Sequence, residues 1–164
     1  MAITLKNKAT LVFDEFKFEC SIGKQGLTKN KKEGDRKTPI GTFSLGNLYY
    51  RSDRLSKPTT NLKCTKIKKQ MGWCDDIKYK KYYNKLIKKN KIIKNESLYR
   101  RDHKYDLMIP IHYNTKNTKL GSGSAIFLHL TSNLKPTAGC ITLKKKDFLI
   151  LIKLINRKTQ IKTA

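Results

Sequence analysis

Two residues in the last third of the chain have the types and the spacing that cysteine chemistry needs. His129 ends an apolar, strand-like run at 124–130, and Cys140 follows eleven residues later in the Thr-Ala-Gly-Cys turn at 137–140. A nucleophilic thiol needs a base to form thiolate near neutral pH, and attack on a carbonyl needs backbone N–H groups directed at the oxyanion. Gly139 allows the backbone to turn so that consecutive amides face the reacting carbonyl. The pair therefore favours acyl transfer.

His112 is the main competitor for the role of base. It also ends a strand-like run, whereas His103 lies among charged residues that predict a solvated turn. A lone cysteine or histidine is usually a packing residue. The glycine before Cys140, the strand ends and a long upstream loop together indicate a site. We predict His129 as the base because its run leads directly to Cys140.

The composition bounds the possible partners. The chain has 164 residues and a formal charge of +25, with lysines spread from Lys6 to Lys162. One explanation for this excess is a genome rich in A and T, whose codons favour Lys, Asn and Ile. The other is that the protein binds an anionic polymer such as RNA, peptidoglycan or a phospholipid surface. The even spread favours the first explanation. No apolar run of about 18 residues exists, so we expect no membrane span.

The cysteines are spaced too widely for a zinc knuckle or ribbon, and no two histidines form a close ligand pair. We therefore expect no metal. A disulfide between Cys64 and Cys74 stays open for an oxidising compartment. Residues 1–15 contain neither a continuous apolar segment nor a cleavage pattern, so we expect no export signal in this chain.

The elements that must position the pair are mostly strands. Runs at 9–13 and 16–20 predict a hairpin, and a polar, glycine-punctuated loop leads into a strand at 41–45. Two further strands are predicted at 105–113 and 124–130. In the second, alternation places Ala125, Phe127 and His129 on one face and Ile126, Leu128 and Leu130 on the other. Since Pro110 lacks a backbone donor, it predicts an edge or a bulge in the first.

Two helices are predicted. An apolar stripe at helical spacing indicates one over 144–155, packed on the sheet; its members are Phe148, Leu151, Ile152 and Ile155. A second stripe follows Asp75 and Asp76, which suit a helix N-terminus; it consists of Tyr79, Tyr82, Tyr83, Leu86 and Ile87. We predict a single, mostly β domain over 1–164, with a few peripheral helices and a catalytic core at about 9–155.

Taken together, these segments resemble the catalytic domain of YkuD-type L,D-transpeptidases over most of the chain. That family has a histidine at a strand end, a variable loop, and then Ser/Thr-His-Gly-Cys before an apolar residue. His129, Thr137, Gly139 and Cys140 take the matching places. The segment 35–43 is similar to the acidic residue and Thr-Pro-x-Gly-x-Phe sequence of the family. The Met-Gly-Trp-Cys-Asp-Asp stretch at 71–76 is similar to one bacterial branch.

Three departures from the family pattern bear on the mechanism. Ala138 stands where the second histidine is usual, Thr142 stands where an arginine is frequent, and the loop after His129 is short. Because the upstream histidine is taken as the base, the first change need not abolish catalysis. The second removes the usual partner of a substrate carboxylate, for which a lysine such as Lys144 is a substitute.

The resemblance implies a peptidoglycan L,D-transpeptidase or L,D-carboxypeptidase acting on stem peptides in cell-wall and cell-shape biosynthesis, without cofactor or metal. Cys140 would be the nucleophile and His129 the base, oriented by the Leu130 carbonyl. The Gly139 and Cys140 amides would hold the oxyanion, while Thr137 and Tyr113 would contact substrate. The family is expected in the cell envelope or periplasm, although a cytoplasmic location stays open. The alternative is a basic, non-catalytic module that binds RNA or an anionic surface; no RNA-binding signature is found, so no specific nucleic acid is expected.

Overall fold

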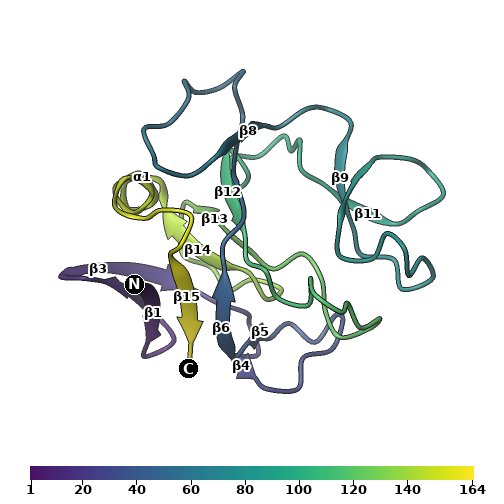
Figure 1. Cartoon of the computed structure of the whole chain (residues 1–164), viewed down its shortest axis with the longest axis horizontal. Helices are drawn as coiled ribbons and strands as arrows, with labels where there is room; N and C mark the ends of the chain where they lie inside the picture. The colour runs from purple at the N-terminus through teal and green to yellow at the C-terminus, as the bar shows by residue number, and fades with distance from the viewer.

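A curled sheet of ten strands forms most of the computed structural model, which describes all 164 residues (Figure 1). Its strands, in sheet order, are β6 (Gly41–Ser44), β15 (Gln160–Thr163), β1 (Ala2–Lys6), β2 (Thr10–Phe13), β3 (Phe16–Ser21), β14 (Ile141–Lys144), β13 (Phe127–Thr131), β12 (Leu107–Pro110), β7 (Leu48–Tyr50) and β8 (Cys64–Lys66). The mostly β prediction is confirmed. The sheet extends past the expected core of 9–155, because β1 and β15 pair in parallel.

The predicted N-terminal hairpin is confirmed as β2 and β3, which pair antiparallel. Asp14, in the connecting turn, has a φ of +51°, a left-handed conformation that short polar residues tolerate. Leu11, Phe13 and Phe18 are buried in the main hydrophobic core. The polar loop that follows contains the short pair β4 (Leu27–Thr28) and β5 (Thr38–Pro39) before β6 begins.

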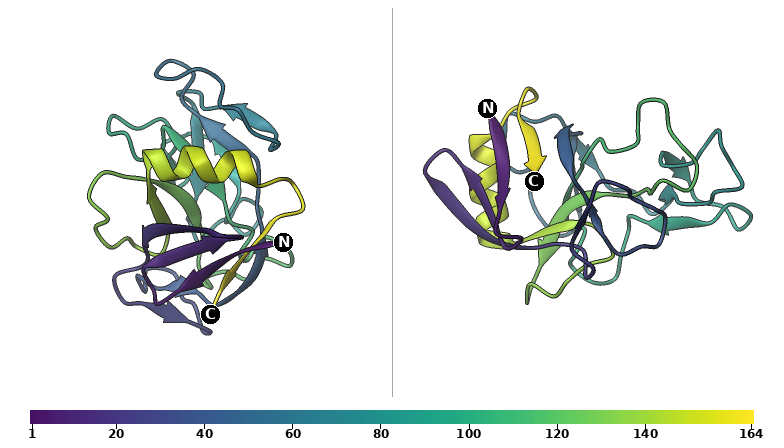
Figure 2. Two further views of the ribbon diagram at one scale, coloured as in Figure 1. Left: turned by 90° about the vertical axis from the view of Figure 1, so that its left-hand side faces the viewer. Right: turned by 90° about the horizontal axis from the view of Figure 1, so that it is seen from below.

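A separate sheet of three strands lies on the opposite side of the molecule from β1 and β3 (Figures 1 and 2). It consists of β9 (Met71–Cys74) between β10 (Leu86–Lys88) and β11 (Asn95–Ser97), both antiparallel to it. β11 supplies Glu96 to the cavity described below.

The helix predicted from the tyrosine stripe is wrong. Its segment forms a single turn, in which the Tyr82 and Tyr83 amides both bond to the Tyr79 carbonyl, and then continues as β10. Asn84 interrupts the helical path with a φ of +58°. Its side chain accepts a hydrogen bond from Trp73 Nε1 and donates to the carbonyls of Tyr113 and Asn114. These tertiary bonds outweigh the local helical pattern.

The C-terminal helix is confirmed as α1 (Lys145–Leu154), the one helix in the structure. Phe148, Leu151 and Ile152 are fully buried and belong to the main core, and α1 contacts β13 and β14 (Figure 2). No helix is long and apolar enough to cross a bilayer.

β13 lies inside the sheet, antiparallel to β12 and parallel to β14. The predicted alternation is reflected in its packing: Leu128 and Leu130 join the main core, whereas Phe127 joins a smaller cluster with Trp73 and Cys140.

Of the two alternatives predicted from Pro110, the edge position is wrong, since β7 covers the other side of β12. The register between the Met108–Tyr49 pair and the Ile111–Leu45 bridge shifts by one residue, as a bulge beside Pro110 requires. Pro110 is tolerated because it is the last residue of β12, beyond the part paired with β7.

The four cysteines are free, including Cys64 and Cys74. The disulfide that the sequence left open is therefore absent from the structure. Cys20, Cys74 and Cys140 are buried.

Candidate active site

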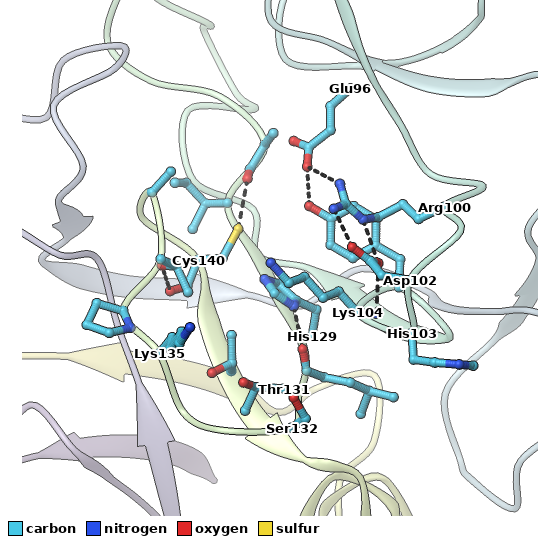
Figure 3. Close-up of a pocket in the computed structure, with 18 of the residues that line it drawn as sticks. Glu96, Arg100, Asp102, His103, Lys104, His129, Thr131, Ser132, Lys135 and Cys140 are labelled. Atoms are coloured by element: carbon cyan, nitrogen blue, oxygen red, sulfur yellow. Dashed lines mark hydrogen bonds and ion pairs between the residues drawn. The ribbon is translucent and has the colours of Figure 1, made fainter.

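Parallel pairing of β13 with β14 brings His129 and Cys140 to one cavity. Leu128 pairs with Ile141 and His129 with Thr142, so Cys140, immediately before β14, lies beside the start of β13. Both residues line a cavity of about 1070 Å³. Figure 3 shows the two side chains close together within it.

The thiol of Cys140 is held by the backbone of the neighbouring segment. Sγ donates to the Ala125 carbonyl at 3.3 Å and accepts from the Phe127 N–H at 3.4 Å. Burial raises the thiol pKa to about 12, and the nearby Glu96 adds to this; the Phe127 N–H and the charge of Lys31 act in the opposite direction. A pKa this far above neutral pH makes Cys140 a neutral thiol at rest, with its S–H directed at the Ala125 carbonyl and no hydrogen bond to His129.

His129 is fixed in one tautomer by its surroundings. Nδ1 lies 2.9 Å from the Leu130 carbonyl, and a carbonyl only accepts, so Nδ1 carries the proton and Nε2 has the free lone pair. The ring packs at 78° against Tyr105, with 5.1 Å between centroids. Burial lowers the His129 pKa to about 4 against the opposing effect of the Leu130 carbonyl, and the charges of Lys104 and Arg100 lower it further. The imidazole is therefore in its basic form near neutral pH.

The turn before Cys140 is closed by two threonines. Thr137 Oγ1 donates to the Cys140 carbonyl at 2.6 Å and accepts from the Gly139 N–H at 3.0 Å. Thr38 Oγ1, from β5, donates to the Gly139 carbonyl at 2.8 Å. Gly139 has a φ of +143°, and a Cβ there would lie 2.9 Å from the Lys37 carbonyl oxygen. Only glycine fits both the conformation and the space.

These bonds change which amides are free to meet an oxyanion. The Gly139 N–H, expected as one donor, is already bonded to Thr137. The N–H groups of Ala138 and Cys140 have no acceptor in the protein. Thr137 therefore bonds within the turn, where it orients the peptide groups around Cys140.

A cluster that the sequence did not indicate lies behind His129. The Tyr105 hydroxyl donates to Glu96, and the Arg100 guanidinium lies 5.1 Å from the Tyr105 ring centroid. Arg100 also pairs with Asp102 at 2.6 Å and Glu96 at 3.9 Å. Burial raises the pKa values of both Glu96 and Tyr105. Tyr105, followed by Asp106, belongs to the resemblance to one bacterial branch of the family, but no motif marked Glu96 or Arg100, because only tertiary folding brings β11 beside Tyr105.

Several other residues lie differently from the sequence prediction. Tyr113 does not line the cavity: its hydroxyl donates to the Ser122 carbonyl at 2.6 Å and its ring packs edge-on against Phe43. The substrate contact predicted for it is therefore not supported. His112 bonds to Ser44 at 3.0 Å and lines a different hollow, while the His103 side chain is 82% exposed at the cavity rim.

The cavity carries charges of both signs. Its cationic side chains are Lys31, Arg100, Lys104, Lys135, Lys144 and Lys145, and its carboxylates include Glu33, Asp75 and Glu96. Thr142 is uncharged, and its hydroxyl is hydrogen-bonded to the Ser21 hydroxyl at 2.5 Å. Lys144 lines the cavity and pairs with Glu19 at 3.4 Å. No group of three or more His, Cys, Asp or Glu side chains is arranged to hold a metal ion.

This geometry accompanies a clear family match. A profile of the YkuD L,D-transpeptidase catalytic domain matches residues 3–162, and the chain belongs to that family. His129, Cys140 and the glycine turn lie within the matched region, which also contains the curled sheet except for Ala2 of β1 and Thr163 of β15.

Among solved structures, the chain is similar to the helical cell shape determining protein Pgp2 from Campylobacter jejuni, with a TM-score of 0.52 and 15% identity. A mutant of the same protein matches with a TM-score of 0.47 and 16% identity. Each match covers 99% of this chain and 46% of the other, so the chain spans about half the length of these structures. At this identity the likeness shows the fold. No curated protein matches the chain.

Proposed function

We propose that the protein is a peptidoglycan L,D-transpeptidase that acts through a thioester on Cys140. The observation that carries the proposal is the meeting of Cys140, a neutral His129 with a free Nε2, and unbonded amides in one cavity of a YkuD-family domain. The substrate would be a stem peptide, and the place of action the cell envelope, where peptidoglycan lies. The cell-shape role of Pgp2 fits such a reaction.

In the first step, the Cys140 side chain leaves the Ala125 carbonyl and turns toward His129. Nε2 takes the thiol proton as Sγ attacks the carbonyl between the L-centre and the terminal D-residue. The unbonded N–H groups of Ala138 and Cys140 are the donors available to the resulting oxyanion. Collapse breaks the peptide bond, His129 returns the proton to the leaving amine, and a thioester remains.

In the second step, an acceptor resolves the thioester. The amine of a second stem peptide gives a cross-link, whereas water gives a trimmed peptide and makes the protein an L,D-carboxypeptidase. His129 removes the acceptor's proton in either case, and the thiol is regenerated. The two outcomes differ in how well the bound acceptor excludes water from the cavity.

Acylation by a carbapenem, which mimics the end of the stem peptide, tests the nucleophile. We expect the intact mass to rise by one carbapenem per chain, and Cys140→Ser to abolish the adduct. Cys20→Ser and Cys74→Ser are matched controls, because both thiols are buried like Cys140 but lie outside the cavity. An undiminished adduct in Cys140→Ser would rule out the proposed nucleophile.

Product analysis separates the two acceptors. The protein is incubated with a disaccharide tetrapeptide, and the products are identified by mass spectrometry. A tripeptide product with free D-residue indicates the carboxypeptidase, and a cross-linked dimer indicates the transpeptidase. If the tetrapeptide stays intact although the carbapenem reacts, stem peptides of this type are not the substrate.

A further inference from the structure

Lys31 is a buried lysine in the loop between β4 and β5, and it lines the same cavity as Cys140. Its side chain is only 3% exposed. A buried ammonium needs partners, and Nζ donates to Asp35 Oδ1 at 2.5 Å and to the Lys32 carbonyl at 3.1 Å. An ammonium has three N–H donors, so one of the three has no acceptor in the protein.

The ion pair is oriented with its positive end toward the cavity. Asp35 does not line the cavity, whereas Lys31 does. The Asp35 carboxylate also accepts the backbone N–H groups of Lys32 at 2.8 Å and Lys37 at 2.9 Å. Burial alone would raise the pKa of Asp35, but these donors and the Lys31 ammonium together lower it. The negative charge is thus held by backbone donors away from the nucleophile.

The aliphatic part of the Lys31 side chain lies beside the turn at 137–140, which ends at Cys140. A Cβ added at Gly139 would lie 3.7 Å from Lys31 Cε, and one added at Gly123 would lie 2.8 Å from Lys31 Cγ. These methylene groups are therefore enclosed near two glycines, and the ammonium has little freedom to move away. Lys104, Lys135, Lys144 and Lys145 are exposed, so water and salt screen their charges much more strongly.

The charges around Cys140 otherwise disfavour an anion. Glu96 faces it from β11, and Glu33 lines the same cavity. Tyr105 and His129 are neutral in the resting state, and the Arg100 cation is paired with Asp102 and Glu96. Positions 138 and 142 hold Ala and Thr, so neither supplies a positive charge.

We propose that Lys31 supplies the fixed positive charge that stabilises the anion formed at Cys140, first on the thiolate and then on the adjacent oxyanion. Stabilisation of the oxyanion rests on the proposed function, because the oxyanion forms only in that reaction. Stabilisation of the thiolate is a property of Cys140 and does not depend on the substrate. A charge held in place in a buried site is more effective than a mobile one, because it needs no reorganisation during the reaction.

The test compares three variants: Lys31→Met, which keeps the stem but removes the charge; Lys32→Met, an exposed control on the same loop; and the double variant Lys31→Met with Asp35→Asn. The double variant removes the unpaired carboxylate that the single change leaves behind. Two rates are measured for each variant at about pH 8: alkylation of Cys140 by iodoacetamide, followed by peptide mass spectrometry, and acylation by a carbapenem.

We expect both rates to fall at least about tenfold in Lys31→Met and in the double variant, and to be unchanged in Lys32→Met. Thermal unfolding should show that the double variant recovers the stability lost in the single one. A double variant with the wild-type rates would overturn the proposal, because Lys31 would then only hold Asp35 and the loop. Wild-type protein that resists the carbapenem would count against the proposed function, while alkylation would still report on Lys31.

Discussion

Burial shifts the pKa values of Cys140 and His129 in opposite directions. It raises the pKa of the Cys140 thiol to about 12 and lowers that of the His129 imidazole to about 4, so both are neutral at rest. A thiolate–imidazolium pair is therefore unfavourable in the free protein, and proton transfer becomes favourable only when an electrophile is in place. The buried cysteine should consequently resist adventitious alkylation better than an exposed thiol does.

Replacing His129 by Ala should slow carbapenem acylation by about 100- to 10,000-fold, the usual contribution of a positioned base. His112→Ala is the matched control, since that ring lies in a different hollow and bonds only to Ser44. Stopped-flow measurement of acylation checks both variants. Equal slowing in the two, or slowing in His112→Ala alone, would show that the base is misassigned.

Because His129 is buried in its neutral form, the free energy of unfolding should also depend on pH. Its pKa is lowered from 6.5 to about 4, so between these values the unfolded chain binds more protons than the folded one. The His129 contribution to stability is thus present above pH 6.5 and is lost as the pH falls toward about 4. We expect urea unfolding of His129→Gln to show a smaller loss across this range than the wild type. An identical pH dependence in both would contradict the buried neutral state.

Among the elements of the fold, β5 as well as β14 supports the turn at 137–140. Thr38 and the Lys37 carbonyl, both in or next to β5, close around Gly139. The loop that the sequence marked by its glycines and Thr-Pro pair is therefore a structural support for Cys140. It also carries Lys31 into the cavity.

Gly139→Ala should disrupt this support. The new Cβ would lie 2.9 Å from a backbone oxygen at a φ of +143°, so we expect a loss of about 1–3 kcal/mol and a large fall in acylation rate. Gly26→Ala is the control: its φ is +79° with nothing within 4 Å, so only backbone strain of about 1 kcal/mol applies. Urea unfolding and carbapenem acylation measure both effects. Normal acylation in Gly139→Ala would show that the turn tolerates a side chain.

Local patterns predicted the elements whose structure is decided locally. The β2–β3 hairpin, the two faces of β13 and the stripe of α1 all follow from alternation or helical spacing. The helix predicted from the tyrosine stripe does not form, because Asn84 and Trp73 make a tertiary hydrogen bond that a local sequence pattern cannot indicate.

The candidate site likewise contains residues that a sequence motif could mark and residues that only the folded structure brings to the cavity. His129 on β13 and Cys140 immediately before the adjacent β14 lie close in sequence, so the motif could mark them. Lys31, Glu96 and Tyr105 reach the cavity from distant segments, and their roles depend on burial that the sequence does not display.

The whole molecule carries a formal charge of +25, which is the basis of the alternative function. Because the lysines are spread along the chain, we expect RNA binding to be weak and sequence-blind, and to be lost steeply between about 50 and 200 mM salt. Fluorescence anisotropy with RNAs of two unrelated sequences, measured across that range, checks this. A sequence-selective complex that survives at the higher salt would favour a nucleic-acid-binding module instead of the enzyme.

The place of β15 in the sheet also has a consequence for the order of folding. β15 lies between β1 and β6, so these two early strands cannot be joined until residues 160–163 have left the ribosome. During synthesis, β1 has only β2 as a neighbour, and its other edge stays open for most of translation. The sheet therefore closes late, by a contact between distant ends of the domain, which is typical of slow folding. A chain that stalls before β15 is made would expose β1 to pairing with other chains.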